Sequence, residues 1–194
     1  MKTLDVSGHI ANCDEYLRNL DKGDRAYYRR ARRYGDVIDC LVQLGLTNDE
    51  TVVDVGAGWT EFDFCLRTTA AWKGRYIPVD GSHDGVDLEV WSPPRQAEYF
   101  VCLELLEHLE NPRRLLMELR ANATKGVFIS TPNPATTDVL GMDSTHKTPI
   151  HMDDLLAWGA WQTWERTYYG KKDDSLFCYF RGQCSPTTPL ALVK

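Results

Sequence analysis

The stretch Thr51-Val-Val-Asp-Val55, followed at once by Gly56-Ala-Gly58, decides the fold of this chain. A short run of β-branched residues predicts a buried strand, and the two glycines predict a tight turn at its end. A helical pattern follows over residues 60–71. A strand that turns through glycines into a helix is typical of an open α/β sheet, in which ligands bind beyond the carboxyl ends of the strands.

The segments that follow alternate between strand and helix patterns. Strands are expected at residues 75–80, 98–103, 126–130, 163–169 and 175–181, and helices at 111–122 and 152–161. Only the polar turn Gly170–Asp174 separates the last two strands, so these must pair antiparallel. The sequence therefore predicts an α/β fold, a Rossmann-like doubly wound and mostly parallel sheet of about seven strands with an antiparallel C-terminal hairpin.

The residues before the first strand are expected to form helices. Apolar residues recur there at helical spacing, namely Tyr27, Ala31, Tyr34, Ile38 and Leu41. Gly35 is a point where this helix is expected to bend or break. A second face carries Arg25, Arg29, Arg32 and Arg33, which either meet solvent or contact an anionic substrate. No linker is visible, so residues 1–48 form an N-terminal helical cap of one domain, 49–185 its main body, and 186–194 a C-terminal tail.

The composition limits the classes of function. The 194 residues are 43% hydrophobic and 26% charged, as expected of one folded domain. The net charge of −6 argues against nucleic-acid binding driven by overall charge, although a local basic patch stays compatible with it. No Cys-x-x-Cys pair occurs, the N-terminus is polar, and no apolar stretch reaches the ~20 residues of a membrane helix. These features predict a cytoplasmic protein with reduced thiols and no membrane partner.

Acidic residues surround the glycine turn. Asp54 lies in the first strand, Glu61 stands where a Gly-x-Gly-x-x-Gly pattern has its third glycine, and Asp80 ends the second strand. A dinucleotide would place its pyrophosphate at this turn, where two carboxylates would repel it. The same carboxylates suit the positive sulfonium and ammonium groups of S-adenosylmethionine, and Asp80 suits its ribose hydroxyls. The pattern therefore favours S-adenosylmethionine over a dinucleotide as cofactor.

Four successive motifs resemble those of the class I S-adenosylmethionine-dependent methyltransferases. They are Asp54-Val-Gly-Ala-Gly58, Asp80, Cys102-Leu-Glu-Leu-Leu-Glu-His-Leu109 and Ile129-Ser-Thr-Pro-Asn-Pro134. The resemblance covers residues 50–181 and implies that residues 49–185 are a class I methyltransferase domain. It implies cofactor-binding roles for seven residues: Asp54, Gly56 and Gly58 at the methionine part, Asp80 at the ribose, Asp87 and Leu88 at the adenine, and Glu104 beside the methyl group.

Two features depart from the family pattern. The interval from Asp80 to Asp87 is short, so the second helix and third strand of the family are expected to be trimmed. Thr60 stands where many members carry a third glycine, so the turn must accommodate a β-branched side chain. The adenine contacts and the glycine turn are therefore the places where this chain is expected to differ from the family.

A cluster of acids and histidines follows the strand at 98–103. Glu104, Glu107 and His108 share a face if they form a helical turn, and His146 lies downstream. Two carboxylates and two imidazoles suit Mg²⁺ or Mn²⁺. The set is similar to the metal site of small-RNA 3′-terminal 2′-O-methyltransferases, and its Glu-x-x-Glu-His part is similar to metal-assisted O-methyltransferases of ubiquinone synthesis. A metal site, His108 as a general base without metal, and a structural role all stay open.

Three functions are compatible with these motifs. The first is O-methylation of a small-molecule or nucleotide hydroxyl, with Glu107 and His108 as the catalytic residues. The second is 2′-O-methylation of an RNA 3′ end with a divalent metal, which needs the N-terminal arginines to face the active-site mouth. The third is a non-catalytic module that binds S-adenosylmethionine. No motif selects the acceptor or the oligomeric state.

Three smaller expectations concern the second half of the chain. Thr131-Pro-Asn-Pro134 predicts a rigid turn at the edge of the sheet. The three tryptophans Trp158, Trp161 and Trp164 are expected to pack in the core. Tyr168 and Tyr169 alternate along an expected strand, so one of them should be buried.

Overall fold

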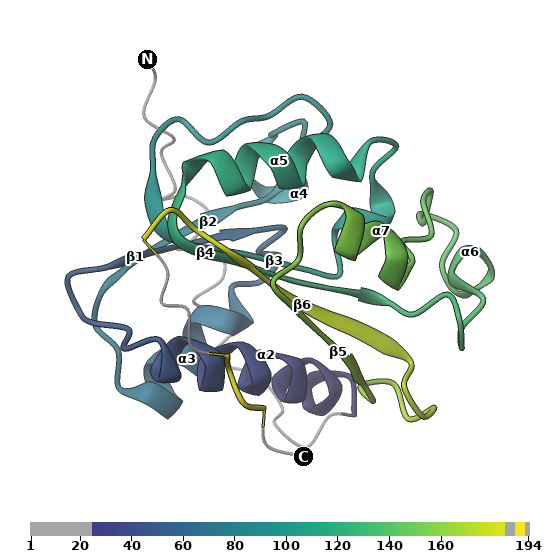
Figure 1. Ribbon diagram of the computed structural model, residues 1–194, viewed down its shortest axis with the longest axis horizontal. Helices are drawn as coiled ribbons and strands as arrows, with labels where there is room; N and C mark the ends of the chain where they lie inside the picture. The colour runs from purple at the N-terminus through teal and green to yellow at the C-terminus, as the bar shows by residue number, and fades with distance from the viewer. Residues whose placement is uncertain (1–24, 185–188, 193–194) are drawn as a thin grey trace.

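The computed structural model describes residues 25–184 and 189–192 and shows one sheet with helices on both of its faces (Figure 1). Any helix expected within residues 1–24, and most of the expected C-terminal tail, lies outside the described residues. The strand order is β2-β1-β3-β4-β6-β5. The strands are β1 (Thr51–Val55), β2 (Arg75–Val79), β3 (Ala97–Leu103), β4 (Ala123–Pro132), β5 (Gln162–Arg166) and β6 (Ser175–Arg181).

The pairing confirms the expected mixed sheet. Strands β2, β1, β3 and β4 pair parallel to one another. Strand β6 pairs antiparallel with both β4 and β5. The described sheet has six strands where about seven were expected. Between β2 and β3 the chain forms the short helix α4 (Gly81–Asp84) and turns, because Gly85, Pro93 and Pro94 disfavour a further strand there.

Two helical layers sandwich the sheet. Figure 1 shows α2 (Arg25–Gln43) and α3 (Glu61–Ala70) on one face, with α5 (Pro112–Asn122) and α7 (Met152–Ala157) on the other. Each layer has its own buried cluster, with Ile38 and Phe62 in one and Leu115 in the other. Strand β3 has side chains in both clusters, as a central parallel strand must. Burial of each such large side chain contributes about 1.5–3 kcal/mol.

Helix α2 keeps the expected apolar stripe but does not break. Tyr27, Ile38 and Leu41 are buried against the sheet. The expected break at Gly35 does not occur, because packing of this stripe outweighs the roughly 1 kcal/mol that glycine costs in a helix. Arg29 and Arg32 are exposed, whereas Arg33 is buried. The helix therefore directs only part of its positive charge toward solvent.

Strand β6 has the expected bounds, whereas β5 and α7 are shorter than expected. Strand β5 ends at Arg166 because the Asp174 carboxylate accepts hydrogen bonds from the backbone N–H groups of Tyr168 and Tyr169, which closes a turn. As expected, one tyrosine of this pair is buried, namely Tyr168. Helix α7 ends at Ala157, ahead of a left-handed glycine, rather than continuing to residue 161.

The three tryptophans near the C-terminal elements differ in their burial. Trp158 and Trp164 pack against the two clusters, but Trp161 is exposed, and its ring instead lies beside the guanidinium of Arg181. The prediction of core packing was therefore wrong for Trp161.

Among the helices of the described residues, none combines the length and the apolar character needed to span a membrane.

Candidate functional site

The glycine bend lies at the carboxyl end of β1. The backbone N–H groups of Gly56 and Ala57 donate to the carbonyl of Val79, at 2.8 and 3.2 Å, which joins the bend to the end of β2. Gly56 has a φ of 80°, and a Cβ added there would meet the Leu105 side chain at 3.1 Å. Glycine is therefore needed both for the backbone conformation and for the close approach to the segment after β3.

Thr60 completes this bend in an unfavourable conformation. Its φ is 57°, in the left-handed region that a β-branched residue adopts only at a cost of about 1–2 kcal/mol. It precedes α3 without a side-chain capping bond. The turn therefore accommodates threonine where many family members have glycine, and it stores strain at the expected cofactor site.

Asp54 and Asp80 lie on either side of the bend. The buried Asp54 carboxylate accepts a hydrogen bond of 2.6 Å from the Tyr76 hydroxyl. Asp80 accepts from the backbone N–H of Gly58 at 3.0 Å, and it caps α4 by accepting from Ser82. Each oxygen of a carboxylate has further acceptor capacity, so Asp80 is able to accept from ribose hydroxyls as well. The structure thus brings Asp54, Gly58 and Asp80 together at one edge.

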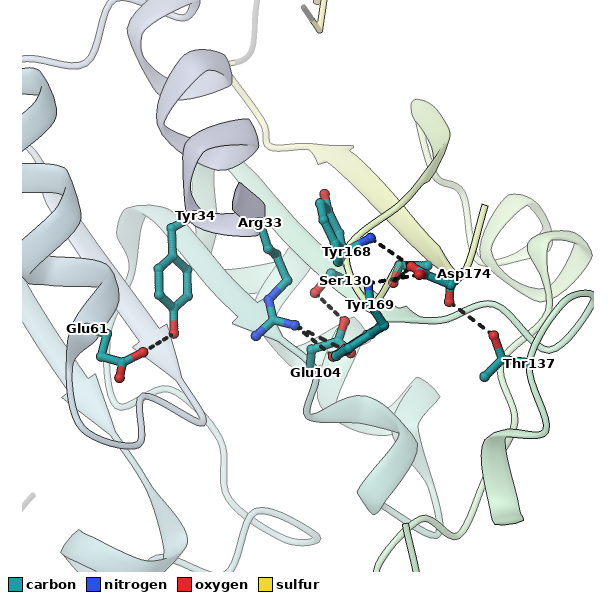
Figure 2. A network of polar contacts seen from close by, with 10 residues as sticks. Arg33, Tyr34, Glu61, Glu104, Ser130, Thr137, Tyr168, Tyr169 and Asp174 are labelled. Atoms are coloured by element: carbon teal, nitrogen blue, oxygen red, sulfur yellow. Dashed lines mark hydrogen bonds and ion pairs between the residues drawn. The ribbon is translucent and has the colours of Figure 1, made fainter. Parts of the chain in front are cut away.

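Glu61 is less free than the sequence suggested. Arg30 donates two hydrogen bonds to its carboxylate, at 2.6 and 2.8 Å, and the Tyr34 hydroxyl donates a third at 3.3 Å. Figure 2 shows the contact between Tyr34 and Glu61 beside the rest of the network. Because Arg30 neutralises Glu61, the repulsion of a pyrophosphate at the bend depends chiefly on Asp54 and Asp80.

Glu104 follows β3 and is held by residues from three distant elements. Its carboxylate accepts from Ser130 Oγ at 2.8 Å and from the Tyr169 hydroxyl, and it lies 3.5 Å from Arg33 Nη1 (Figure 2). The Glu104 side chain is only 12% exposed and that of Arg33 only 7%. Burial acts to lower the pKa of the Arg33 guanidinium, but Glu104, together with Tyr169 and Tyr34, raises it above its usual value. This buried pair joins α2 to the end of β3.

Asp87 and Leu88, the expected adenine contacts, form a turn. The Asp87 carboxylate is exposed and accepts from the backbone N–H of Glu89. The Leu88 side chain is buried in the core, and its carbonyl accepts from Arg114. Their contact with an adenine stays a prediction.

Glu107, His108 and His146 form a cluster at the same edge of the sheet. Each offers a ligand atom, and these atoms all lie within 4.8 Å of one another. Glu107 is completely buried, and neither carboxylate oxygen makes a hydrogen bond of good geometry within the described residues. Burial, and secondly the nearby Glu104 carboxylate, raise the pKa of Glu107 well above its usual range. The Thr131 hydroxyl lies near this carboxylate but makes no well-formed hydrogen bond with it. A buried carboxylate with such poor hydrogen bonding is costly, which makes Glu107 a candidate ligand.

The two histidines are oriented by contacts at Nδ1. His146 Nδ1 lies 2.6 Å from the Val139 carbonyl and must donate to it, which leaves Nε2 as the ligand atom. His108 Nδ1 lies 2.9 Å from the Thr145 hydroxyl. Burial and the proximity of His146 lower the pKa of His108, which favours the neutral imidazole that a metal requires. The structure does not bring the Glu104 carboxylate into this cluster.

Several site residues had little or no signal in the sequence. Arg30 and Arg33 follow helical spacing, but their acidic partners lie far away along the chain. Tyr169 contacts Glu104 across 65 residues, a separation that periodicity does not bridge. Thr145 gave no signal at all. Such contacts depend on how α2, α3 and the β5–β6 hairpin are arranged in space, which local sequence patterns do not determine.

Comparisons with known proteins bear on the fold. No protein-family model matches the sequence, and no curated protein matches it. Among solved structures, the chain is similar to the complex between the Haloferax volcanii Trm112 methyltransferase activator and a methyltransferase, with a TM-score of 0.61 and 12% identity, covering 90% of this chain and 97% of that one.

Two further similar structures were solved with S-adenosylhomocysteine. One is magnesium protoporphyrin IX methyltransferase from Synechocystis, with a TM-score of 0.57, 14% identity and coverage of 91% and 96% of the two chains. The other is the plantazolicin methyltransferase BpumL, with a TM-score of 0.56, 10% identity and coverage of 92% and 96%. The chain therefore has the fold of the class I S-adenosylmethionine-dependent methyltransferases.

Proposed function

We propose that this chain is an S-adenosylmethionine-dependent methyltransferase that methylates a hydroxyl group of a small molecule or nucleotide. The observation that carries the proposal is the buried, unsatisfied carboxylate of Glu107, which lies beside His108 and His146. Glu107 and His108 follow β3, whereas His146 follows the short helix α6 (Val139–Met142). Gly56 of the glycine bend approaches Leu105, which lies in the segment after β3. Glu107 and His108, which are able to take the proton of an acceptor hydroxyl, therefore lie next to the glycine bend that suits the methyl donor.

Arg33 supports the placement of the methionine part of the donor. Its Nη1 group faces Tyr169 and Glu104, whereas its buried Nε–H group makes no hydrogen bond with the described residues. The Nε–H and Nη2–H groups form the fork that guanidinium offers to a carboxylate. The donor carboxylate fits this fork, and Asp80 fits the ribose at the other end of the bend.

Glu107, His108 and His146 also fit a divalent cation. The fit depends on the unsatisfied Glu107 oxygens and on the imidazole Nε2 atom that the Val139 contact leaves available on His146. A bound cation at such a site lowers the pKa of a coordinated hydroxyl. The chain itself supplies the orientation: contacts at Nδ1 fix both imidazole rings, and the backbone carbonyl of Glu107 accepts from Lys147 and Thr148.

Thermal unfolding with added ligands tests this proposal. S-adenosylmethionine and S-adenosylhomocysteine are expected to raise the unfolding temperature, because a ligand that binds only the folded state stabilises it. NAD is the control, and each ligand is added with and without Mn²⁺ or Mg²⁺. Stabilisation by NAD alone would contradict the cofactor assignment. Donor binding without methylated product from any hydroxyl acceptor would instead support the non-catalytic module.

The RNA alternative depends on the exposed arginines of α2. Arg29 and Arg32 are exposed on the helix whose buried face carries Arg33 to the site. If an RNA end is the acceptor, RNA binding should weaken with salt, and the paired change Arg29→Glu/Arg32→Glu should flatten that salt dependence. Binding of RNA that is insensitive to both salt and the paired change would contradict this alternative.

A further inference from the structure

The candidate ion site consists of three side chains of the described structure: Glu107, His108 and His146. We propose that Tyr169 and Arg33 are positioning residues that hold the Glu104 carboxylate outside the ion site, so that Glu107, His108 and His146 alone select Mn²⁺ over Mg²⁺. The inference deepens the proposed function and rests on it. It departs from the Glu-x-x-Glu-His resemblance, which implies that both glutamates are ligands.

The backbone of Glu104 sets the first part of this arrangement. Glu104 has a φ of 51°, in the left-handed region, immediately after β3. Its N–H group donates to the carbonyl of Ser130 at 2.9 Å, which continues the pairing of β3 with β4 by one residue. A non-glycine residue keeps such a conformation only where its surroundings impose it.

The Glu104 carboxylate is satisfied by other residues. Ser130 donates to one oxygen, while Tyr169 donates to the other and Arg33 lies beside it (Figure 2). One cation and two hydroxyl groups thus hold this anion on the side of α2. Glu107, three residues later, has neither a tyrosine hydroxyl nor a guanidinium bonded to it in the described structure, and the nearby Thr131 hydroxyl makes no hydrogen bond of good geometry with its oxygens. The Glu104 carboxylate is therefore already bonded to other side chains, whereas the Glu107 carboxylate is able to bind an ion.

The turn that carries Tyr169 is itself fixed. The Asp174 carboxylate accepts from the backbone N–H groups of Tyr168, Tyr169 and Lys171, at 2.8 to 3.0 Å. The backbone of Asp173 and Asp174 is also bonded to the turn after β4. Asn133 N–H donates to the Asp174 carbonyl, and Asn133 Nδ2 donates to the carbonyl of Asp173. The Tyr169 hydroxyl is therefore held over Glu104 by a turn anchored to two strands.

Helix α2 holds Arg33 in a similar way. One turn further along, the Asp36 carboxylate accepts two hydrogen bonds of 2.7 Å from Arg166 on β5 and one from the Tyr168 hydroxyl. This buried contact joins the helix to the hairpin. Arg33 and Tyr169 therefore belong to one assembly of helix and hairpin, and they act on Glu104 together.

The chemical consequence concerns ion selectivity. With Glu104 excluded, the ion site offers one carboxylate and two imidazole nitrogens. Mg²⁺ prefers oxygen ligands and keeps its water shell, whereas Mn²⁺ and other first-row divalent ions accept imidazole readily. Adding a second carboxylate would make the site more favourable for Mg²⁺. The positions of Tyr169 and Arg33 thus determine which ion the site prefers.

The first experiment identifies the ligands. Mn²⁺ binding to the full chain is followed by loss of the free-ion electron paramagnetic resonance signal, without donor or acceptor. Glu107→Gln is expected to weaken Mn²⁺ binding at least about tenfold, whereas Glu104→Gln should leave it within about twofold of wild type. A tenfold weakening in Glu104→Gln would overturn the inference, because it would make Glu104 a ligand.

The second experiment tests the positioning. The concentration of Mg²⁺ that releases half of the bound Mn²⁺ is measured in wild type, Tyr169→Phe and the matched control Tyr168→Phe, which loses a hydroxyl bonded to Asp36 instead. Tyr169→Phe is expected to lower that concentration about tenfold. The double change Tyr169→Phe/Glu104→Gln should restore the wild-type value. An unchanged value in Tyr169→Phe, or a low value that persists in the double change, would overturn the inference.

A parallel titration separates this inference from the proposed function. S-adenosylhomocysteine binding is measured by calorimetry on the same preparations. Retained nucleoside binding in a wild-type chain that binds no Mn²⁺ would overturn the ion site and this inference but leave the methyl-donor proposal standing. Loss of both would overturn the proposed function as well.

Discussion

Some residues at this site have a strained backbone, whereas others accept several hydrogen bonds that fix the chain around them. Thr60 and Glu104 both adopt left-handed backbone conformations at the carboxyl ends of neighbouring strands. Asp174, in contrast, accepts hydrogen bonds from several groups of one turn. The strained backbone conformations persist because such well-bonded residues nearby fix the surrounding backbone.

The strain at Thr60 leads to a stability prediction. Thr60→Gly should raise the free energy of unfolding by about 0.5–1 kcal/mol, because glycine adopts a positive φ without steric cost. The matched control is Thr69→Gly within α3, which should lower it by about 0.3–0.5 kcal/mol, because glycine is that much less favourable than threonine inside a helix. Urea denaturation of the three proteins measures both. Destabilisation by Thr60→Gly would mean that the threonine side chain contributes packing that exceeds its strain.

The free edge of Arg33 leads to a binding prediction. Arg33→Gln should weaken S-adenosylhomocysteine binding about 10- to 100-fold, since a charge-assisted pair with a carboxylate is lost. Binding of 5′-methylthioadenosine, which has no carboxylate, should change little. Calorimetry with both nucleosides measures the difference. Equal losses for the two ligands would show that Arg33 supports the fold of the pocket rather than the carboxylate.

At the scale of elements, the sequence predicted what local patterns determine. The strands β1, β2 and β3 and the helices α3 and α5 lie close to where β-branched runs and apolar spacing placed them. The ends of β5 and α7 were wrong, because an aspartate several residues away and a left-handed glycine stop them. The acids and histidines of the site were found by motif, but their partners on α2 and the hairpin were not, since those contacts exist only after the sheet has formed.

The contact between α2 and the hairpin should carry much of the stability of this assembly. Asp36→Ala should lower the free energy of unfolding by about 3 kcal/mol, because it leaves the mostly buried Arg166 and the Tyr168 hydroxyl without their partner. The control Arg67→Ala removes a pair with Asp63 whose arginine is 40% exposed, and should cost about 0.3–0.5 kcal/mol. Guanidinium denaturation measures both. Similar losses would contradict a specific role for the buried contact.

The whole molecule brings distant segments to one edge of the sheet. The glycine bend and the hairpin turn are separated by a long stretch of sequence, yet Figure 2 shows Arg33 and Glu104 between Glu61, which follows the bend, and the turn that carries Tyr169. Figure 1 places α5 on the opposite face from α2 and α3. A ligand bound at the carboxyl ends of the parallel strands should therefore stabilise segments that lie far apart in the sequence. It should leave α5, on the opposite face of the sheet, unchanged.

Hydrogen exchange with bound S-adenosylhomocysteine checks this arrangement. Amides of residues 56–61, 81–84 and 168–174 are expected to gain protection together, by about tenfold or more, because ligand binding lowers the population of locally open states. The amides of α5 serve as the internal control and should not change. Protection limited to residues 56–61 would show that the hairpin turn does not belong to the donor site.

The short connection between β2 and β3 has a consequence for association between molecules. It leaves β2 at one border of the sheet. Arg75 N–H donates to Glu50, and Val79 accepts from Gly56, so alternate residues of β2 point their amides toward β1, and the position of Pro78 faces outward. Proline has no amide hydrogen, so the middle of that border lacks a donor. A neighbouring chain that tried to extend the sheet there would lose a ladder bond at its centre, which protects this border against aggregation.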